Sequence, residues 1–198
     1  MTMPPTSDLA LIYPETIVAV TAVAVLMADL WLRPQQRGIL IVLSLLGLLG
    51  AGWVMGFSHL EGVAFAGLYV RDALTRAGQL LSLAVTGLGI LVAPEYLRRI
   101  GQERGEYYTL VLIAGAGAML MAASRDLLML FLALETLSIP LYVLAASGRG
   151  SVRSQEAGMK YFLLGAFASA FFLFGVALLY GVAGTTRLPE IARVLSGA

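Results

Sequence analysis

Residues 126–146, DLLMLFLALETLSIPLYVLAA, decide the fold because they place twenty almost wholly apolar residues in a row. A helix of about 20 such residues spans the roughly 30 Å hydrocarbon core of a bilayer. The only charge within the apolar run, Glu135, sits close to its midpoint. The stretch therefore predicts a transmembrane helix that carries a carboxyl group halfway across the membrane.

The same apolar pattern recurs along the chain and predicts an all-α, polytopic transmembrane helix bundle. Six spans are expected, at about 9–32, 38–57, 77–97, 107–124, 127–147 and 157–182. Their short connections leave no room for a soluble domain, so residues 1–198 read as one membrane domain. Within it, 9–105 hold the first three helices, 106–184 the next three, and 185–198 a short interfacial helix capped by Thr185 or Thr186.

Composition excludes several classes of function. The chain is 59% hydrophobic and only 13% charged, whereas an ordinary soluble domain carries about 25% charged residues. It has no cysteine and a single histidine, His59, so we expect no disulfide, metal site or redox cofactor within it. The net charge of +1 gives no basic surface for nucleic acid. The expected partners are lipid and other membrane proteins.

Arginines in alternate connections predict the orientation of the bundle. Seven Arg residues fall in the connections at 33–37, 98–104 and 149–153, and five fall on the opposite side. The positive-inside rule then places the N-terminus outside the cytoplasm, with Arg98, Arg99 and Arg104 fixing the topology. The residues before the first span include Asp8 but no Lys or Arg. The span is therefore not a typical secretory signal, and we expect it to remain in the mature protein.

Glu135 is the principal candidate for function. An ionised carboxylate at the bilayer centre costs about 2.5–3.5 kcal/mol, so it must be paired, protonated or in contact with water. Helical spacing puts Ser138 and Tyr142 on its face, and Pro140 frees the carbonyl of Thr136 and favours a kink. Glu135 is interpreted either as a proton-carrying acid, which we prefer, or as a neutral acid that bonds two helices together.

Lys160, the only lysine, is the second candidate. It is predicted either to exchange protons as a buried amine, or to reach the interface or pair with Glu156 four residues earlier. Counted from the turn at 148–156, Glu135 lies about 18 Å along its helix and Lys160 about 6 Å along the next. We therefore expect linked titration of the two groups rather than a direct ion pair.

The remaining polar residues are expected to be structural. Glu15 and Asp29 lie near the two ends of the first span, where acids are tolerated. His59 is expected to be a solvated loop residue. Small residues four apart predict close helix packing, namely Gly52 with Gly56, Ala114 with Ala118, and Ala166 with Ala170.

Two stretches resemble a known family. They are EYYTLVLIAGAGAMLMAASRDLLMLFLALETLSIPLYVLAA and SQEAGMKYFLLGAFASAFFLFGVALLYG, within about residues 106–187. They are similar to subunit N of bacterial NADH-quinone oxidoreductase, respiratory complex I, whose fifth helix carries the Glu that matches Glu135 and whose sixth carries the Lys that matches Lys160. Less specifically, YVRDALTRAGQLL resembles the approach to the family's third helix.

The resemblance implies an antiporter-like subunit at the start of an inverted-repeat fold, where Glu135 and Lys160 take part in proton translocation. It implies that NAD, FMN, iron–sulfur clusters and quinone are held by partner subunits, and that adjacent antiporter-like subunits are neighbours in the bacterial inner membrane. The family's further lysines lie on later helices, beyond Ala198, so the chain is expected to contain only the beginning of the first repeat and not to pump alone.

Three alternatives stay open. A monovalent-cation/proton antiporter and a membrane-bound hydrogenase reuse the same helix bundle, although the LSIPLYVLA and MKYFLLGAFASAF segments favour the quinone oxidoreductase. A purely structural bundle would hold Glu135 in a dry hydrogen bond, whereas transport requires a hydrated cavity around it.

Overall fold

The computed structural model describes residues 5–33, 36–57, 60–99, 101, 104–148 and 150–197, so the prediction for His59 lies outside the described residues. Within these ranges, six helices are long and apolar enough to cross a membrane. They are α2 (Tyr13–Trp31), α3 (Gly38–Phe57), α4 (Ala73–Arg99), α5 (Gly105–Ala123), α6 (Leu127–Ala145) and α7 (Val152–Ala183). The predicted all-α transmembrane bundle is confirmed.

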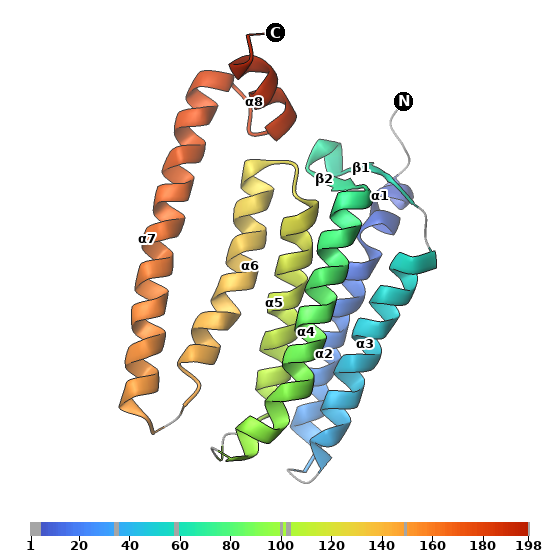
Figure 1. Cartoon of the computed structure of the whole chain (residues 1–198), viewed down its shortest axis with the longest axis vertical. Coiled ribbons are helices and arrows are strands. Elements are labelled where there is room, and N and C mark those ends of the chain that lie inside the picture. Colours follow the sequence, from blue (N-terminus) through green and yellow to red (C-terminus); the bar gives the residue numbers. More distant parts are fainter. Residues whose placement is uncertain are drawn as a thin grey trace.

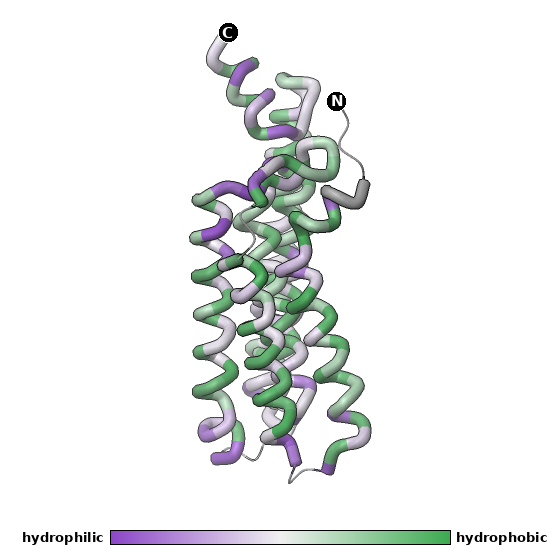
Figure 2. Tube along the Cα trace, turned by 90° about the vertical axis from the view of Figure 1, so that its right-hand side faces the viewer, coloured by the Kyte–Doolittle hydropathy of each residue, from purple (hydrophilic) through white to green (hydrophobic). Residues whose placement is uncertain are grey.

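Helix α5 lies at the centre of the bundle, where it packs against α2, α4 and α6 (Figure 1). The largest buried cluster joins α2, α3, α4 and α5, whereas α7 packs along α6 at the edge. Hydrophobic residues dominate the middle of the bundle and hydrophilic ones gather toward its two ends (Figure 2). This distribution is the one that a helix bundle needs in a bilayer.

A β-hairpin covers one end of the bundle, between the second and third spans, where hydropathy predicts only a connection. Strands β1 (Gly62–Ala64) and β2 (Tyr69–Arg71) pair antiparallel, and the 3-10 helix η2 (Phe65–Gly67) joins them. The short helix α1 (Pro5–Leu11) packs beside β1. Its Asp8 carboxylate accepts a hydrogen bond from the Phe65 backbone N–H at 3.1 Å. The hairpin, which forms the connection between α3 and α4, is therefore bonded to α1.

Two helices begin earlier than hydropathy predicted, because polar residues cap them. Asp72 accepts a hydrogen bond from the Thr75 backbone N–H at 2.8 Å, and α4 begins at Ala73. This bond holds the pKa of Asp72 below its usual range. Ser151 likewise accepts from the Ser154 N–H at 3.3 Å at the start of α7. Capping residues satisfy the N–H groups that a helix start leaves unpaired.

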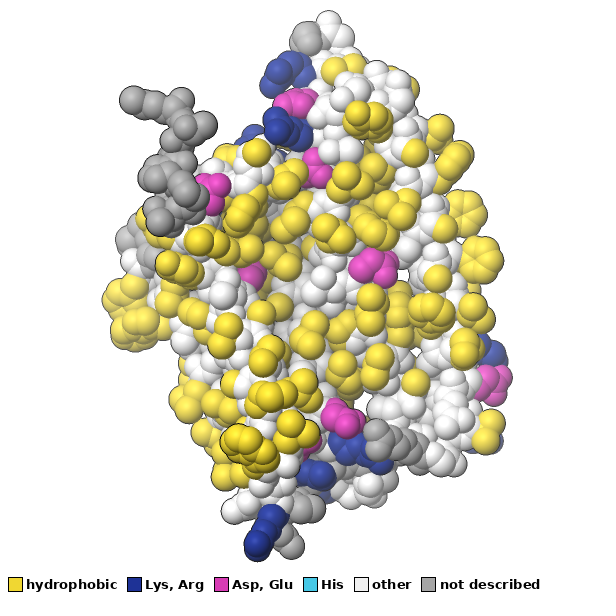
Figure 3. All heavy atoms as spheres, turned by 180° about the vertical axis from the view of Figure 1, so that it is seen from behind, with side chains coloured by type: hydrophobic (Ala, Val, Ile, Leu, Met, Phe, Trp, Pro, Cys, Tyr) yellow, Lys and Arg dark blue, Asp and Glu magenta, His cyan; other side chains and the backbone are white. Residues whose placement is uncertain are grey.

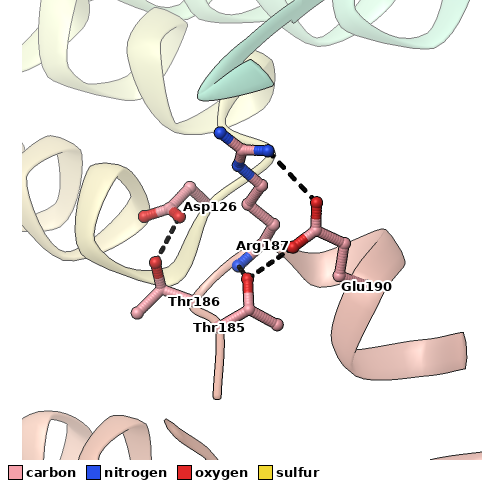
Figure 4. Close-up of polar contacts among 5 residues, drawn as sticks. All are labelled: Asp126, Thr185, Thr186, Arg187 and Glu190. Atoms are coloured by element: carbon pink, nitrogen blue, oxygen red, sulfur yellow. Dashed lines mark hydrogen bonds and ion pairs between the residues drawn. The ribbon is translucent and has the colours of Figure 1, made fainter. Parts of the chain in front are cut away.

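The predicted short helix after the last span is present as α8 (Leu188–Leu195). Its predicted cap is wrong: the N-cap residue is Arg187, and no side chain caps the helix. The Thr185 hydroxyl instead donates to Glu190 at 2.7 Å, and Arg187 pairs with the same carboxylate at 3.1 Å (Figure 4). Both contacts hold the pKa of Glu190 below its usual range.

Asp126 joins this C-terminal segment to α6. Its Oδ1 caps α6 by accepting from the Leu128 backbone N–H at 2.8 Å, and its Oδ2 accepts from the Thr186 hydroxyl at 2.5 Å (Figure 4). Ile191 of α8 completes the contact by packing with Leu127 and Val176. The connections that follow α5 and α7 therefore meet at one end of the bundle.

Among the glycines of the described residues, the closest approach to the backbone of another helix falls outside the predicted small-residue pairs. A Cβ atom at Gly117 of α5 would lie 2.5 Å from the backbone nitrogen of Leu137 in α6. In contrast, a Cβ at Gly52 would meet only an ordinary contact at 3.9 Å, and one at Gly56 would meet nothing within 4 Å. Ala166 and Ala170 lie on an exposed part of α7. Of the predicted pairs, only Ala114 and Ala118 of α5 lie within the bundle, where Ala114 is buried and Ala118 is half-buried.

Replacing Gly117 with Ala should destabilise the bundle by about 1–3 kcal/mol, because the added methyl group meets backbone rather than a movable side chain. Gly56→Ala is the matched control, since it adds the same group to open space. Thermal unfolding of the detergent-solubilised protein measures both. Equal melting temperatures for the two variants would show that α5 and α6 are not in close contact at Gly117.

Candidate functional site

Glu135 lies near the middle of α6, which runs from Leu127 to Ala145. At 1.5 Å per residue, its Cα is about 12 Å from one end of the helix and about 15 Å from the other. The side chain is half-buried. Seen from behind, acidic side chains interrupt the hydrophobic surface midway along the bundle (Figure 3). A carboxyl group therefore lies at membrane depth, as the sequence predicted.

Ser169 of α7 donates a hydrogen bond to Oε1 of Glu135. Sequence analysis missed this partner, because it lies 34 residues away on the neighbouring helix and serine is common on helix surfaces. The bond joins α6 to α7 at the depth of the carboxyl group. Ser138, which helical spacing had placed on the same face, is half-buried and does not share the bond.

Tyr142 and Pro140, the other predicted members of the stripe, are buried. Helix α6 continues through Pro140 to Ala145. The Tyr142 ring packs edge-on against Tyr161 of α7, with 4.8 Å between ring centroids, and its hydroxyl fills the space beside Gly165. Glu135 bonds to Ser169 of α7, and Tyr142 contacts Gly165, one turn earlier on the same helix. The two side chains therefore lie at the same interface between α6 and α7.

Lys160 lies at the outer surface of α7, away from Glu135. Its ammonium group pairs with the Glu156 carboxylate at 2.5 Å, and the two side chains are 70% and 57% exposed. Ser169, the partner of Glu135, lies nine residues further along α7, or about 13–14 Å. The structure therefore brings Lys160 together with Glu156, the local pairing that its sequence spacing allowed, and leaves it separated from Glu135.

A second buried carboxyl group, Glu15 of α2, is more enclosed than the sequence suggested. Its side chain is 3% exposed, and Oε1 accepts hydrogen bonds from the Tyr69 hydroxyl at 2.9 Å and from the Gln79 amide. Arg71 is buried beside it and donates to the Leu11 carbonyl at 3.2 Å. Burial raises the pKa of Tyr69, and the neighbouring Glu15 charge adds to the effect, so the phenol remains a donor.

These partners come from two elements that hydropathy does not connect to α2. Tyr69 and Arg71 belong to β2 and Gln79 to α4, which lie 54 to 64 residues from Glu15. The one available signal was the polar content of the 69–79 segment next to a span. Asp29, near the other end of α2, lies 3.9 Å from the Arg37 guanidinium and fits its predicted structural role.

The surroundings of the two carboxyl groups differ. Glu135 is half-buried and held by one hydroxyl donor, whereas Glu15 is enclosed and held by two donors on a single oxygen. Intramembrane acids commonly form parts of proton or ion paths. Among the described residues, no group of three or more His, Cys, Asp and Glu side chains could hold a metal ion.

Comparison with known proteins identifies one group of relatives. The family described as NADH:quinone oxidoreductase/Mrp antiporter, TM, matches residues 124–198. NADH-quinone oxidoreductase subunit N from Trichlorobacter lovleyi is 42% identical over 96% of this chain, and that from Sphingopyxis alaskensis is 41% identical over 97%. The aligned regions cover 39% and 40% of those two proteins. The chain thus spans about two-fifths of the length of these relatives.

Solved structures show the same fold. A chain of respiratory complex I from Thermus thermophilus with bound aureothin aligns over 92% of this chain and 41% of its own length, with 38% identity and a TM-score of 0.74. A chain of an archaeal membrane-bound sulfane sulfur reductase aligns over 93% of this chain and 39% of its own length, with a TM-score of 0.77. At 22% identity, this second match supports the fold alone.

Replacing Ser169 with Ala should weaken the contact between α6 and α7, because Glu135 loses its hydrogen-bond donor. Such bonds contribute about 0.6 kcal/mol on average in membrane proteins, so we expect a small fall in the melting temperature. Ser82→Ala is the control, since that hydroxyl bonds to the Gly78 carbonyl of its own helix. If Ser169→Ala is no less stable than Ser82→Ala, the bond between the helices contributes nothing.

Proposed function

We propose that this chain, which resembles the N-terminal part of NADH-quinone oxidoreductase subunit N, belongs to a proton-translocating membrane subunit. In this proposal, electron transfer from NADH to quinone takes place in partner subunits and drives proton movement through this one. The supporting observation is Glu135, a carboxyl group near the middle of a transmembrane helix, bonded to Ser169 of the next helix. The subunit would lie in the bacterial inner membrane beside antiporter-like neighbours, with its N-terminus outside the cytoplasm.

Glu135 is the proton-binding group of the proposed path. Its single hydroxyl donor leaves the carboxyl group free to exist in both protonation states, because a serine can donate to a carboxylate and accept from a carboxylic acid. Tyr142, two turns further along α6, lies at the same interface. A fully sealed ion pair would not allow such exchange, because a proton transfer that neutralised one partner would leave the other as an unpaired buried charge.

Lys160 is the second proposed group, at the start of α7. Its pairing with Glu156 holds the ammonium group near the helix end, where it can exchange a proton with water. The separation of about 13–14 Å along α7 means that the amine and Glu135 communicate through water or intervening groups. Their titrations would then be linked through space rather than through a direct bond.

The relatives favour the quinone oxidoreductase over a cation antiporter, since the curated proteins that share 42% and 41% identity with this chain carry the former name. In the proposed assembly, NAD, FMN, iron–sulfur clusters and quinone are bound by other subunits. This division of labour accords with a chain that contains no cysteine to hold a cluster.

Replacing Glu135 with Gln in the assembled complex should lower proton translocation several-fold, because an amide of the same shape cannot release a proton. Proteoliposomes that oxidise NADH report proton uptake and electron transfer together. Glu95→Gln is the matched control, because Glu95 forms an exposed pair with Arg99 on α4. A structural role for Glu135 predicts unchanged proton uptake per NADH in an assembled Glu135→Gln complex, and that result would refute the proposal.

Lys160→Arg separates proton exchange from ion pairing. Arginine keeps the positive charge and can still pair with Glu156, but it does not deprotonate in proteins. We therefore expect Lys160→Arg to lower proton uptake in the same proteoliposomes, while Glu156→Gln, which removes only the pair, has a smaller effect. If Lys160→Arg pumps normally, Lys160 acts only as a fixed charge.

A further inference from the structure

We propose that Glu15 is a second proton-binding carboxyl group, which takes up and releases a proton at the buried Oε2 and lines a groove between α2, α5 and α6. The inference does not depend on Glu135. It rests on three observations: the unequal environments of the two carboxyl oxygens, the groove that Glu15 lines, and the cation beside it. Each is taken in turn below.

The two oxygens of Glu15 are used differently. Oε1 accepts from Tyr69 and from Gln79, and the Tyr69 hydroxyl is itself positioned by the Leu11 carbonyl at 3.2 Å. Oε2 is buried and accepts no hydrogen bond from the described residues. Burying a carboxylate oxygen that carries part of the negative charge and accepts no hydrogen bond costs free energy. A proton on Oε2 removes this cost, because the oxygen then becomes a neutral hydroxyl group.

Glu15 lines a groove of about 360 Å³ that extends to Thr136 on α6. Thr16 and Thr109 also line it, so three threonines stand among mostly apolar lining residues. The hydroxyl groups of Thr16 and Thr136 donate to the carbonyls of Ile12 and Leu132 in their own helices, at 2.9 and 2.7 Å. A hydroxyl oxygen that donates still has lone pairs to accept from water. The groove thus offers acceptors between Glu15 and the residue next to Glu135.

Arg71 stabilises the ionised form of Glu15, so that the carboxyl group can also lose its proton. The Arg71 guanidinium is the charged group that faces Glu15 from β2. The other groups that face it are uncharged: the phenol of Tyr69, also from β2, and the amide of Gln79 from α4. The walls from α5 and α6 contribute Thr109 and Thr136. When the O–H bond at Oε2 breaks, a water molecule that enters beside Glu15 from the groove accepts the proton, and the carboxylate that remains is stabilised by the guanidinium charge.

Infrared difference spectroscopy of the assembled complex, titrated in H₂O and in D₂O, tests the proposal. We expect a carboxylic-acid C=O band that moves to lower frequency in D₂O and loses intensity as the pH rises. Glu15→Gln should abolish this band, whereas Glu135→Gln, the matched control, should retain it. If Glu15→Gln removes no carboxylic-acid band, Glu15 is permanently ionised and the proposal is wrong. A band that is present but insensitive to pH also overturns it.

Tyr69→Phe provides the second test, and it decides the matter if Glu15→Gln does not assemble. This variant removes one donor from Oε1 and leaves the carboxyl group in place. The band should move to higher frequency, because a carbonyl that loses a hydrogen bond has a stronger C=O bond. An unshifted band would assign the signal to another carboxyl group. Neither result depends on whether Glu135 carries protons.

Discussion

The lack of hydrogen-bonding partners in the hydrocarbon core is the constraint on which the structure depends. Several hydroxyl side chains within the spans meet it locally. Those of Thr21, Ser44, Ser82 and Thr86 each donate to the backbone carbonyl four residues earlier. Carboxyl groups cannot do so, because an ionised carboxylate only accepts. Glu15 and Glu135 must therefore find donors on other elements, and this requirement sets them apart from the other polar residues of the spans.

The two carboxyl groups meet this requirement in opposite ways. Glu15 draws its donors from β2 and α4, so the hairpin and helix α4 both depend on its position. Glu135 takes one donor from α7, a helix that packs along α6 on one side and leaves most of its own surface exposed. Glu15 therefore belongs to the closely packed part of the bundle, and Glu135 to the contact between two helices at its edge.

Hydropathy predicted the six spans because the length and apolar character of a membrane helix are written in consecutive residues. Local contacts were also accessible: Glu156 and Lys160 pair at the four-residue spacing that a helix brings together. Contacts distant in sequence were not. Ser169, Tyr69 and Gln79 are ordinary residues in a sequence, and only the packing of different elements makes them partners of Glu135 and Glu15. Similarly, Gly117 is a close contact because α6 passes there, which no spacing rule reveals.

The central claim is that water reaches the face of α6 that carries Glu135. The chain has no cysteine, so a single Ser138→Cys substitution one turn from Glu135 would introduce a unique thiol into it. A water-soluble, membrane-impermeant thiol reagent should modify this thiol in the assembled complex, while a Leu81→Cys control at an exposed, apolar position of α4 should remain unmodified. If both thiols are equally unreactive, no aqueous route reaches Glu135 and the account is contradicted.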